Sequence, residues 1–416
     1  MSSRPAAALV RAVGGWYFAI ALAARLPFAM IVVGVLTMVV DARGSLALGG
    51  LTSAMVGLGT IATGPLIGAA ADRFGQRAVL LVATAAHTGV LVLLVTAAYG
   101  TAPDALVLGA AVLAGATAPQ VSPMSRVRLN AAIERLTGVD RPRLQESTMG
   151  YESAVDEIVF VFGPVLVGVL AIAAGPAAPV LVAAGLTLVS VAAFALHPTA
   201  RAVAHADRTA DREPAAAVLR PGILVAAFGT LAMGLFFGAM LTSLTAFATE
   251  GGFPEQTGIL YGIMGIGSAI LALSVGLFPR RFALSARWTV FAGVLVVGTA
   301  LAASATGVVS MAWALAIAGC GVGPTLATVY ALAAARAPRG REATVMTILG
   351  SAVIVGQALA SMIVGALAEN VGAATALWAP LVAGVLLLAA GFVNAGLRTP
   401  KPDPAPTAVP DPAPLR

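Results

Sequence analysis

The chain has 416 residues, of which 59% are hydrophobic and only 10% are charged. Soluble domains carry roughly 25% charged residues, so this composition excludes a water-soluble globular protein. A formal net charge of +6 does not indicate nucleic-acid binding, because the basic residues lie singly between apolar runs and form no patch. Cys320 is the only cysteine, which excludes a disulfide framework, and no His or Cys pair has the spacing of a metal site. We therefore expect no metal and no other cofactor.

Long apolar runs cover most of the chain. A membrane-spanning helix needs about 20 apolar residues, and the runs have this character without the alternation of barrel strands. The first six lie at about 14–40, 46–71, 78–99, 105–124, 149–174 and 178–196. Six more lie at about 222–248, 258–278, 289–303, 308–335, 344–368 and 373–397.

A polar stretch at 197–220, rich in arginine and aspartate, separates the two sets of runs. Helix starts and basic turns recur on both sides of it at an offset of roughly 200 residues, and such duplication is typical of transporters. The sequence therefore predicts an all-α polytopic membrane protein with twelve transmembrane helices in two pseudo-symmetric six-helix bundles. The predicted parts are an N-terminal bundle (1–196), a cytoplasmic linker (197–220), a C-terminal bundle (221–398) and a disordered cytoplasmic tail (399–416).

The arginines predict the orientation of these spans. When the connections are numbered alternately, all of the 24 basic residues except Arg25 and Arg43 fall on the side of the N-terminus. Basic residues gather on the cytoplasmic side of a membrane, so we expect both termini in the cytoplasm. Arginine far outnumbers lysine, and Ala, Gly and Val abound, which indicates a bacterial sequence and hence a multi-pass protein of the bacterial inner membrane.

The connection between the second and third runs carries a motif with a clear physical reading. Gly68 allows a neighbouring helix to come close, and Gly75 permits a tight turn. Asp72 can form charge-assisted bonds at the membrane face, as can Arg73 and Arg77. The alternative interpretation is an ordinary positively charged turn.

This motif resembles the loop signature of the major facilitator superfamily, Gly-x-x-x-Asp-Arg-x-Gly-x-Arg, although Gln76 replaces a basic residue. The resemblance implies that Asp72 docks against the start of span 11, near Thr344, and latches the outward-facing state. The corresponding turn in the second half, 279–282, lacks the acid, so we expect a one-sided latch. Arg25 and Pro27, within Arg-Leu-Pro-Phe, resemble a first-helix signature of actinobacterial efflux-type members.

Span 5 resembles the exporter motif of the same superfamily. Gly150, Gly163, Pro164 and Gly168 occupy motif positions, whereas valines stand at two others where glycine is usual. A proline inside a helix removes a hydrogen bond and bends the helix, so Gly163 and Pro164 are a candidate hinge. The alternative is an ordinary packing kink.

Span 5 also carries acidic residues that are candidates for proton coupling. An ionised side chain in hydrocarbon costs roughly 2.5–3.5 kcal/mol on insertion scales, and Glu152, Asp156 and Glu157 all lie near or within this run. Arg25 is the only base expected within a span, so we expect an Arg25–Asp156 pair, shared with Glu152, and an excess of negative charge. In the alternative interpretation the acids lie at the cytoplasmic interface, with Glu152 nearest to water.

Resemblance to the superfamily also suggests a substrate cavity between spans 1, 4, 7 and 10. Each candidate could equally serve packing or a hydrogen bond between helices. The candidates are Gln120, Phe236, Thr242, Trp313, Tyr330 and Gln357.

Three functions fit a polytopic protein of this kind. The leading hypothesis is proton-coupled efflux, by antiport and alternating access, of a hydrophobic or amphiphilic small molecule through a monomer in the lipid bilayer. The alternative is a symporter or facilitator that imports a small metabolite, for which charged and amide side chains are scarce. A membrane enzyme or receptor lacks support, because we find no catalytic constellation of residues.

Overall fold

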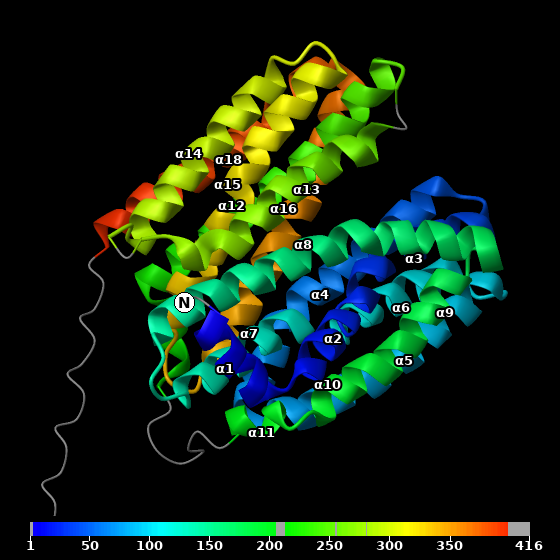
Figure 1. Cartoon of the computed structure of the whole chain (residues 1–416). Coiled ribbons are helices and arrows are strands. Elements are labelled where there is room, and N and C mark those ends of the chain that lie inside the picture. Colours follow the sequence, from blue (N-terminus) through cyan, green and yellow to red (C-terminus); the bar gives the residue numbers. More distant parts are fainter. Residues whose placement is uncertain (1–2, 205–212, 254–255, 280, 398–416) are drawn as a thin grey trace, which may run out of the picture.

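The computed structural model describes residues 3–204, 213–253, 256–279 and 281–397. In this part of the chain, twelve helical segments are long and apolar enough to cross a membrane, which confirms the twelve-span, all-α prediction. The helices form two bundles that lie against each other (Figure 1). The predicted tail and the middle of the predicted linker lie outside the described residues.

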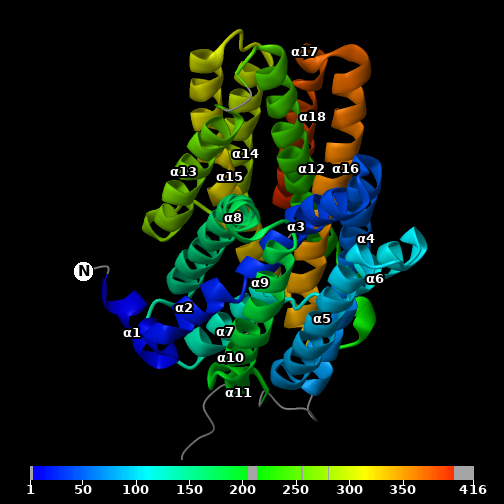
Figure 2. The same cartoon turned by 90° about the vertical axis from the view of Figure 1, so that its right-hand side faces the viewer.

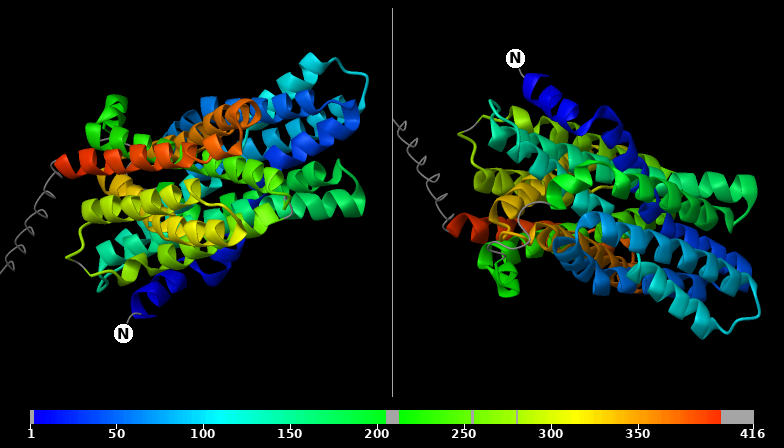
Figure 3. Two further views of the ribbon diagram at one scale, coloured as in Figure 1. Left: turned by 90° about the horizontal axis from the view of Figure 1, so that it is seen from above. Right: turned by 90° about the horizontal axis from the view of Figure 1, so that it is seen from below.

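The N-terminal bundle is preceded by a short helix, α1 (Ser3–Val13), which lies beside the bundles (Figure 3). The bundle itself consists of α2 (Gly15–Ala23), α3 (Leu26–Arg43), α4 (Leu46–Phe74), α5 (Gln76–Tyr99), α6 (Asp104–Ala116), α7 (Val121–Glu134), α8 (Arg141–Ala174), α9 (Ala178–Leu186), the π-helical turn η1 (Thr187–Val191) and α10 (Ala192–Leu196). Helices α2 and α3 together form span 1, α6 and α7 form span 4, and α9 to α10 form span 6.

The C-terminal bundle follows two short linker elements, α11 (Thr199–Ala204) and the 3₁₀ turn η2 (Ala215–Leu219). It consists of α12 (Pro221–Glu250), α13 (Thr257–Ser274), the 3₁₀ turn η4 (Val275–Leu277), α14 (Leu284–Ala303), α15 (Val308–Arg336), α16 (Glu342–Val371), α17 (Ala373–Ala376) and α18 (Ala379–Gly396). Each of its spans other than 8 and 12 is one continuous helix.

Small residues let the helices of each bundle pack closely. A Cβ atom added at Gly234 of α12 would overlap the backbone of Val353 in α16, and one added at Gly59 of α4 would overlap the backbone of Val112 in α6. Inside a membrane, helix association depends on such close packing, because lipid tails are as apolar as the side chains. The glycine-rich composition of the chain is therefore part of what assembles the bundles.

Two spans of the N-terminal bundle are interrupted. Span 1 breaks at Ala24 and Arg25, just before Pro27, and span 4 breaks over residues 117–120, which include Pro119. A proline cannot donate the backbone hydrogen bond that would continue a helix, which accounts for both positions. After its break, span 4 continues to Glu134 rather than ending near residue 124 as predicted.

The two bundles meet on one side of the protein, which we call the linker side because residues 197–204 and 213–220 lie there. Asp72 at the end of α4, and Arg143 and Glu146 in the first turns of α8, all bond to the C-terminal bundle on this side. Away from it the bundles diverge (Figure 1), and the far part of α8 presents exposed apolar side chains such as Phe162 and Ile172. Figure 2 shows α8 running between the bundles, where it contacts α13 and α15.

Candidate functional site

The two helix breaks place polar residues inside the N-terminal bundle. Arg25 is the residue just before α3, Gln120 is the residue just before α7, and Ser122 lies in the first turn of α7. Interrupted helices expose backbone groups within the membrane, and transporters commonly place their binding residues at such positions. The breaks of spans 1 and 4 therefore mark a region to search for function.

Two arginines and two carboxylates form a buried cluster beside these breaks. Arg25 donates from Nη2 to Oε2 of Glu152, and its Nε lies 3.5 Å from Oδ1 of Asp156. Arg126 donates from Nη2 to Oδ2 of Asp156 at 2.7 Å and from Nη1 to Ser122. Glu152 is fully buried, and both arginines are nearly so. Each ion thus has an oppositely charged partner, which offsets part of the cost of burying it.

Further hydrogen bonds hold Glu152 in place. Ser125 donates from Oγ to Oε1 of Glu152 at 3.0 Å, and the hydroxyl of Tyr17 lies 2.9 Å from the same Oγ. The Tyr17 ring packs against Phe194 with a centroid distance of 5.9 Å. Both carboxylate oxygens of Glu152 therefore have partners within the N-terminal bundle. This arrangement suits a fixed counter-ion for Arg25.

Glu157 lies outside this neutral cluster. Its Oε1 accepts a hydrogen bond of 2.6 Å from Oγ of Ser268, which lies on α13 of the other bundle. Its Oε2 is shielded from solvent and has no hydrogen-bond partner, and within the described residues no basic side chain forms an ion pair with it. An unpaired carboxylate in such a place costs several kcal/mol, whereas a neutral carboxyl group costs much less. Glu157 is therefore suited to binding and releasing a proton at the contact between the bundles.

These contacts agree with one expectation from the sequence and correct two others. The predicted Arg25–Asp156 pair is present, with Nε and Oδ1 3.5 Å apart, and it is shared with Glu152, which is the closer partner of Arg25. The expectation that Glu152 is the acid nearest to water is wrong, because its side chain is fully buried, whereas that of Asp156 is 21% exposed. Arg25 is also not the only base within a span: α7 buries Arg126, which the sequence analysis assigned to a loop. Three acids thus face two arginines, and the excess acid is Glu157.

Asp72 lies at the start of α16, where the sequence analysis expected it. Its carboxylate accepts hydrogen bonds from the N–H groups of Ala343 and Thr344, at 3.0 and 2.8 Å, and from the Thr344 hydroxyl at 2.5 Å. Free N–H groups and the positive end of the helix dipole favour a carboxylate at this position. Gly68 lies against Thr347 of α16, and Gly75 has a positive φ of 86° that forms the turn after α4. The role of this contact as a latch remains a prediction.

The other two motif residues lie on the exposed linker side. Arg73 and Arg77 are both exposed, and the Arg73 guanidinium lies 5.1 Å from the ring centroid of Phe74. The one-sided latch remains a prediction, but the contacts between the bundles on this side do not depend on Asp72 alone. Arg287 of the C-terminal bundle donates to Glu146 at 2.5 Å, and a further bond of 2.6 Å runs from Arg143 Nε to the carbonyl of residue 276. In the Arg287–Glu146 pair the acid lies in the N-terminal bundle and the base in the C-terminal bundle. A search of residues 279–282 for a second acid therefore does not reveal this contact.

Comparison with known families decides the classification of this twelve-helix protein. Residues 17–347 match the family model of the Major Facilitator Superfamily. The chain belongs to the major facilitator superfamily. Comparison with curated protein sequences gives no match.

Solved structures with the same fold include several transporters. The human organic anion transporter MFSD10 (TETRAN) is similar at a TM-score of 0.68 and 18% identity, covering 92% of this chain and 99% of that one. A bacterial homologue of the iron transporter ferroportin, in an outward-facing state, gives a TM-score of 0.69 at 14% identity, with coverage of 94% and 99%. The E. coli fucose:proton symporter FucP gives 0.63 at 13% identity, with coverage of 91% and 98%. At these identities the similarity shows the superfamily fold alone.

In this member of the superfamily, the predicted hinge packs inside the N-terminal bundle. A Cβ atom at Gly163 would lie 2.6 Å from Cβ of Ala29 in α3, whereas one at Gly168 would meet nothing within 4 Å. Pro164 lies inside α8, which continues through it to Ala174. The structure therefore gives Gly163 a packing reason, and bending at Gly163 and Pro164 remains a prediction.

Two of the predicted cavity residues lie next to the charged cluster. Gln120 is buried at the break of span 4 and donates to the carbonyl of Ala118 at 3.1 Å. Tyr330 of α15 is 5% exposed, and its ring centroid lies 4.0 Å from Cζ of Arg126. These two residues are thus near the groups that the sequence analysis linked to coupling.

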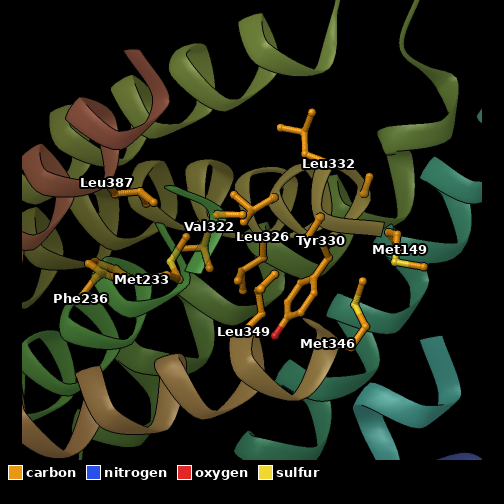
Figure 4. Close-up of a cluster of buried hydrophobic side chains, with 14 of the residues drawn as sticks. Met149, Met233, Phe236, Val322, Leu326, Tyr330, Leu332, Met346, Leu349 and Leu387 are labelled. Carbon is orange, nitrogen blue, oxygen red and sulfur yellow. The ribbon is translucent and has the colours of Figure 1, made fainter. Parts of the chain in front are cut away.

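The other four are dispersed. Phe236 is fully buried in the apolar core of the C-terminal bundle, near Met233 and Leu387 (Figure 4). Thr242 and Gln357 are half-buried on α12 and α16, and Trp313 is 70% exposed in the first turns of α15. The structure does not bring these residues together with the charged cluster.

Sequence reasoning missed Arg126, Ser122, Ser125 and Ser268. Arg126 follows an apolar run closely, so it is typical of a loop, and only its burial beside Asp156 shows its place. The serines are common in membrane helices and carry no signal alone. One signal was available: an i, i+4 spacing places Ser122 and Arg126 on the same helix face.

Proposed function

We propose that this protein is a secondary active transporter that exports a hydrophobic or amphiphilic small molecule in exchange for protons, by alternating access. In this proposal it works as a monomer in the bacterial inner membrane, as an efflux-type member of the superfamily. The linker side faces the cytoplasm, since nearly all basic residues outside the spans belong to connections on that side. The described state is then closed to the cytoplasm.

The observation that carries the proposal is the position of Glu157. It is the one acid of the α8 group without a basic partner among the described residues, and it bonds to Ser268 of the opposite bundle. A proton on Glu157 removes the cost of an unpaired charge between the bundles. Any movement of α8 relative to α13 changes the surroundings of this carboxyl group, which couples proton binding to the exchange between states.

The charge balance supports an uncharged or amphiphilic substrate. Arg25 and Arg126 are already neutralised by Glu152 and Asp156, so they offer no free cation to an anionic substrate. Amide side chains near the cluster are scarce, which disfavours a sugar. The far part of α8 presents apolar side chains where the bundles diverge. The partial exporter motif of α8 favours outward transport.

The structural neighbours support transport as the general activity. They are described as an organic anion transporter, a homologue of an iron transporter and a fucose:proton symporter. Their cargoes differ in charge and size, so the shared fold favours no one substrate.

The test is transport by purified protein in proteoliposomes under an imposed pH gradient. Ethidium and rhodamine 6G serve as amphiphilic probes and fucose as a polar comparison. We expect ethidium or rhodamine to move against the proton flow, with the movement abolished by an ionophore that collapses the gradient. Accumulation of fucose together with inward proton flow would instead support the symporter alternative. Transport of the probes at a rate that does not depend on the pH gradient would contradict proton coupling.

A further inference from the structure

Arg126 contacts both bundles at once. In its own bundle it donates to Asp156 and Ser122. Its guanidinium carbon also lies 4.0 Å from the ring centroid of Tyr330 in the C-terminal bundle. The other cation–π contacts found in the described part of the chain, such as Arg128 over Phe194, lie within one bundle. Arg126 and Tyr330 therefore form a contact that differs from the rest in joining the bundles.

The surroundings of this contact exclude water. Arg126 is 1% exposed and Tyr330 is 5% exposed. Figure 4 shows Tyr330 beside Met346, Leu349 and Leu326. These three residues belong to a cluster of buried apolar side chains that includes residues of both bundles. A cation over an aromatic face is attracted by the ring quadrupole, and the attraction is strongest when both groups are desolvated. This cation–π contact therefore contributes more stabilisation than one that is exposed to water.

The position of the Arg126 guanidinium is set by groups of the charged cluster. Asp156 lies 2.7 Å from its Nη2, and the same carboxylate also lies 3.5 Å from Nε of Arg25. Ser122 bonds both to Arg126 and, at 2.7 Å, to Asp156. A change at Asp156 must therefore move or reorient Arg126 relative to Tyr330. From the C-terminal bundle, the contact found for this guanidinium in the described part of the chain is with the face of the Tyr330 ring.

We infer that Arg126, positioned by Asp156 and Ser122, holds the linker side of the protein closed through its cation–π contact with Tyr330. Arg126 is thus a positioning residue that connects the charged cluster to the closure of the bundles. The inference rests on the proposed function only in that it assumes two states, one closed and one open on the linker side. It assigns Tyr330 a role in that equilibrium instead of substrate binding.

The test uses a cysteine buried between the bundles. Ser351 of α16 is 5% exposed and lies against Gly64 of α4, so Ser351→Cys is a small change that reports opening of this interface. In a Cys320→Ala background, reconstituted in lipid nanodiscs, the rate of alkylation by N-ethylmaleimide follows the population of the open state. Thr137→Cys, on the exposed loop after α7, reports reagent access independent of opening.

Two variants at Tyr330 distinguish the effect of the aromatic face from that of the side-chain volume. Tyr330→Phe keeps the aromatic face, and we expect its alkylation rate within about twofold of the wild type. Tyr330→Leu removes the face at similar volume, and we expect alkylation of Ser351→Cys to accelerate roughly 30-fold. Equal rates for the Phe and Leu variants, or acceleration of the Thr137→Cys control as well, would overturn the inference.

A second comparison tests the positioning step. Asp156→Asn should also accelerate alkylation, but it should add little in the Tyr330→Leu background, because both changes disable the same contact. Arg126→Lys keeps a cation and should open the protein less than Arg126→Gln. Full additivity of Asp156→Asn with Tyr330→Leu would show that Asp156 does not act through this contact. None of these measurements requires transport. A failure of the proposed transport function can therefore be distinguished from a failure of the Arg126–Tyr330 contact to hold the linker side closed.

Discussion

Replacement of Asp72 by asparagine tests the bonds that close the linker side. The carboxylate of Asp72 accepts three hydrogen bonds at the start of α16, two from backbone N–H groups and one from the Thr344 hydroxyl. Asparagine keeps one acceptor oxygen and loses the negative charge. The loss of a charge-assisted hydrogen bond costs about 1.5–3 kcal/mol, and the interaction with the helix dipole contributes up to about 2 kcal/mol in a partly buried site.

Part of this loss is recovered by water in the open state, so we expect a net effect of about 2–3 kcal/mol. That energy shifts the equilibrium roughly 30- to 150-fold toward the state open on the linker side. Thr344→Val removes one of the three bonds and keeps the two from the backbone. It should therefore shift the equilibrium much less, by about 1 kcal/mol.

Distances between spin labels measure this shift directly. One pair, at Thr137 and Ala286, reports the linker side, and a second pair, at Thr101 and Thr306, reports the far side; all four residues are exposed. In Asp72→Asn the first pair should move apart and the second should approach. The matched control is Asp104→Asn, since Asp104 is 60% exposed and pairs with Arg43 at 3.5 Å, a contact worth less than about 1 kcal/mol. Distance distributions in Asp72→Asn equal to those of the control would refute the reasoning.

Three further changes test the buried cluster, the packing of α8 and the start of the linker. Glu152→Gln leaves Arg25 without its closest counter-ion and should lower stability by about 3–5 kcal/mol, seen as a lower melting temperature in detergent. Gly163→Leu should destabilise strongly because it overlaps α3, whereas Gly168→Leu meets open space and should not; the same melting assay compares the two. Burial lowers the pKa of His197 in the folded protein. The neutral side chain therefore contributes its full stabilisation above the unfolded-state pKa of about 6.5, and this stabilisation is lost as the pH falls from that value through the lower folded-state pKa. Protection of α11 against hydrogen exchange, corrected for the intrinsic pH dependence of amide exchange, should therefore fall at low pH. His197→Asn should abolish this loss of protection; an unchanged loss in that variant would contradict the prediction.

The fold could be predicted from the sequence because the bilayer imposes a simple rule on it. A chain must cross in long apolar helices, so apolar runs and arginine positions were sufficient for the number of spans. The rule fails where a charge is buried in a pair. Arg126 was assigned to a loop because its partner, Asp156, lies 30 residues further along the chain, and no local pattern reveals that pairing.

The candidate site could be predicted only in part, for the same reason. The cost of an acid in hydrocarbon identifies Glu152, Asp156 and Glu157 as special, but it does not say which one lacks a partner. That distinction depends on contacts across the fold, such as Ser268 with Glu157. The partner of Asp72 could be predicted, because its motif indicates a contact with the start of span 11 and the free N–H groups at a helix start bind a carboxylate.

In the proposed function, the unpaired carboxyl of Glu157 carries the exchanged proton. In proteoliposomes, Glu157→Gln should still exchange ethidium across the membrane without a gradient, because a neutral amide can replace the protonated acid in the contact with Ser268. It should no longer drive ethidium against its concentration when a pH gradient is imposed. Gradient-driven accumulation by Glu157→Gln at the wild-type rate would contradict the account, whereas retained exchange with lost accumulation is the predicted result.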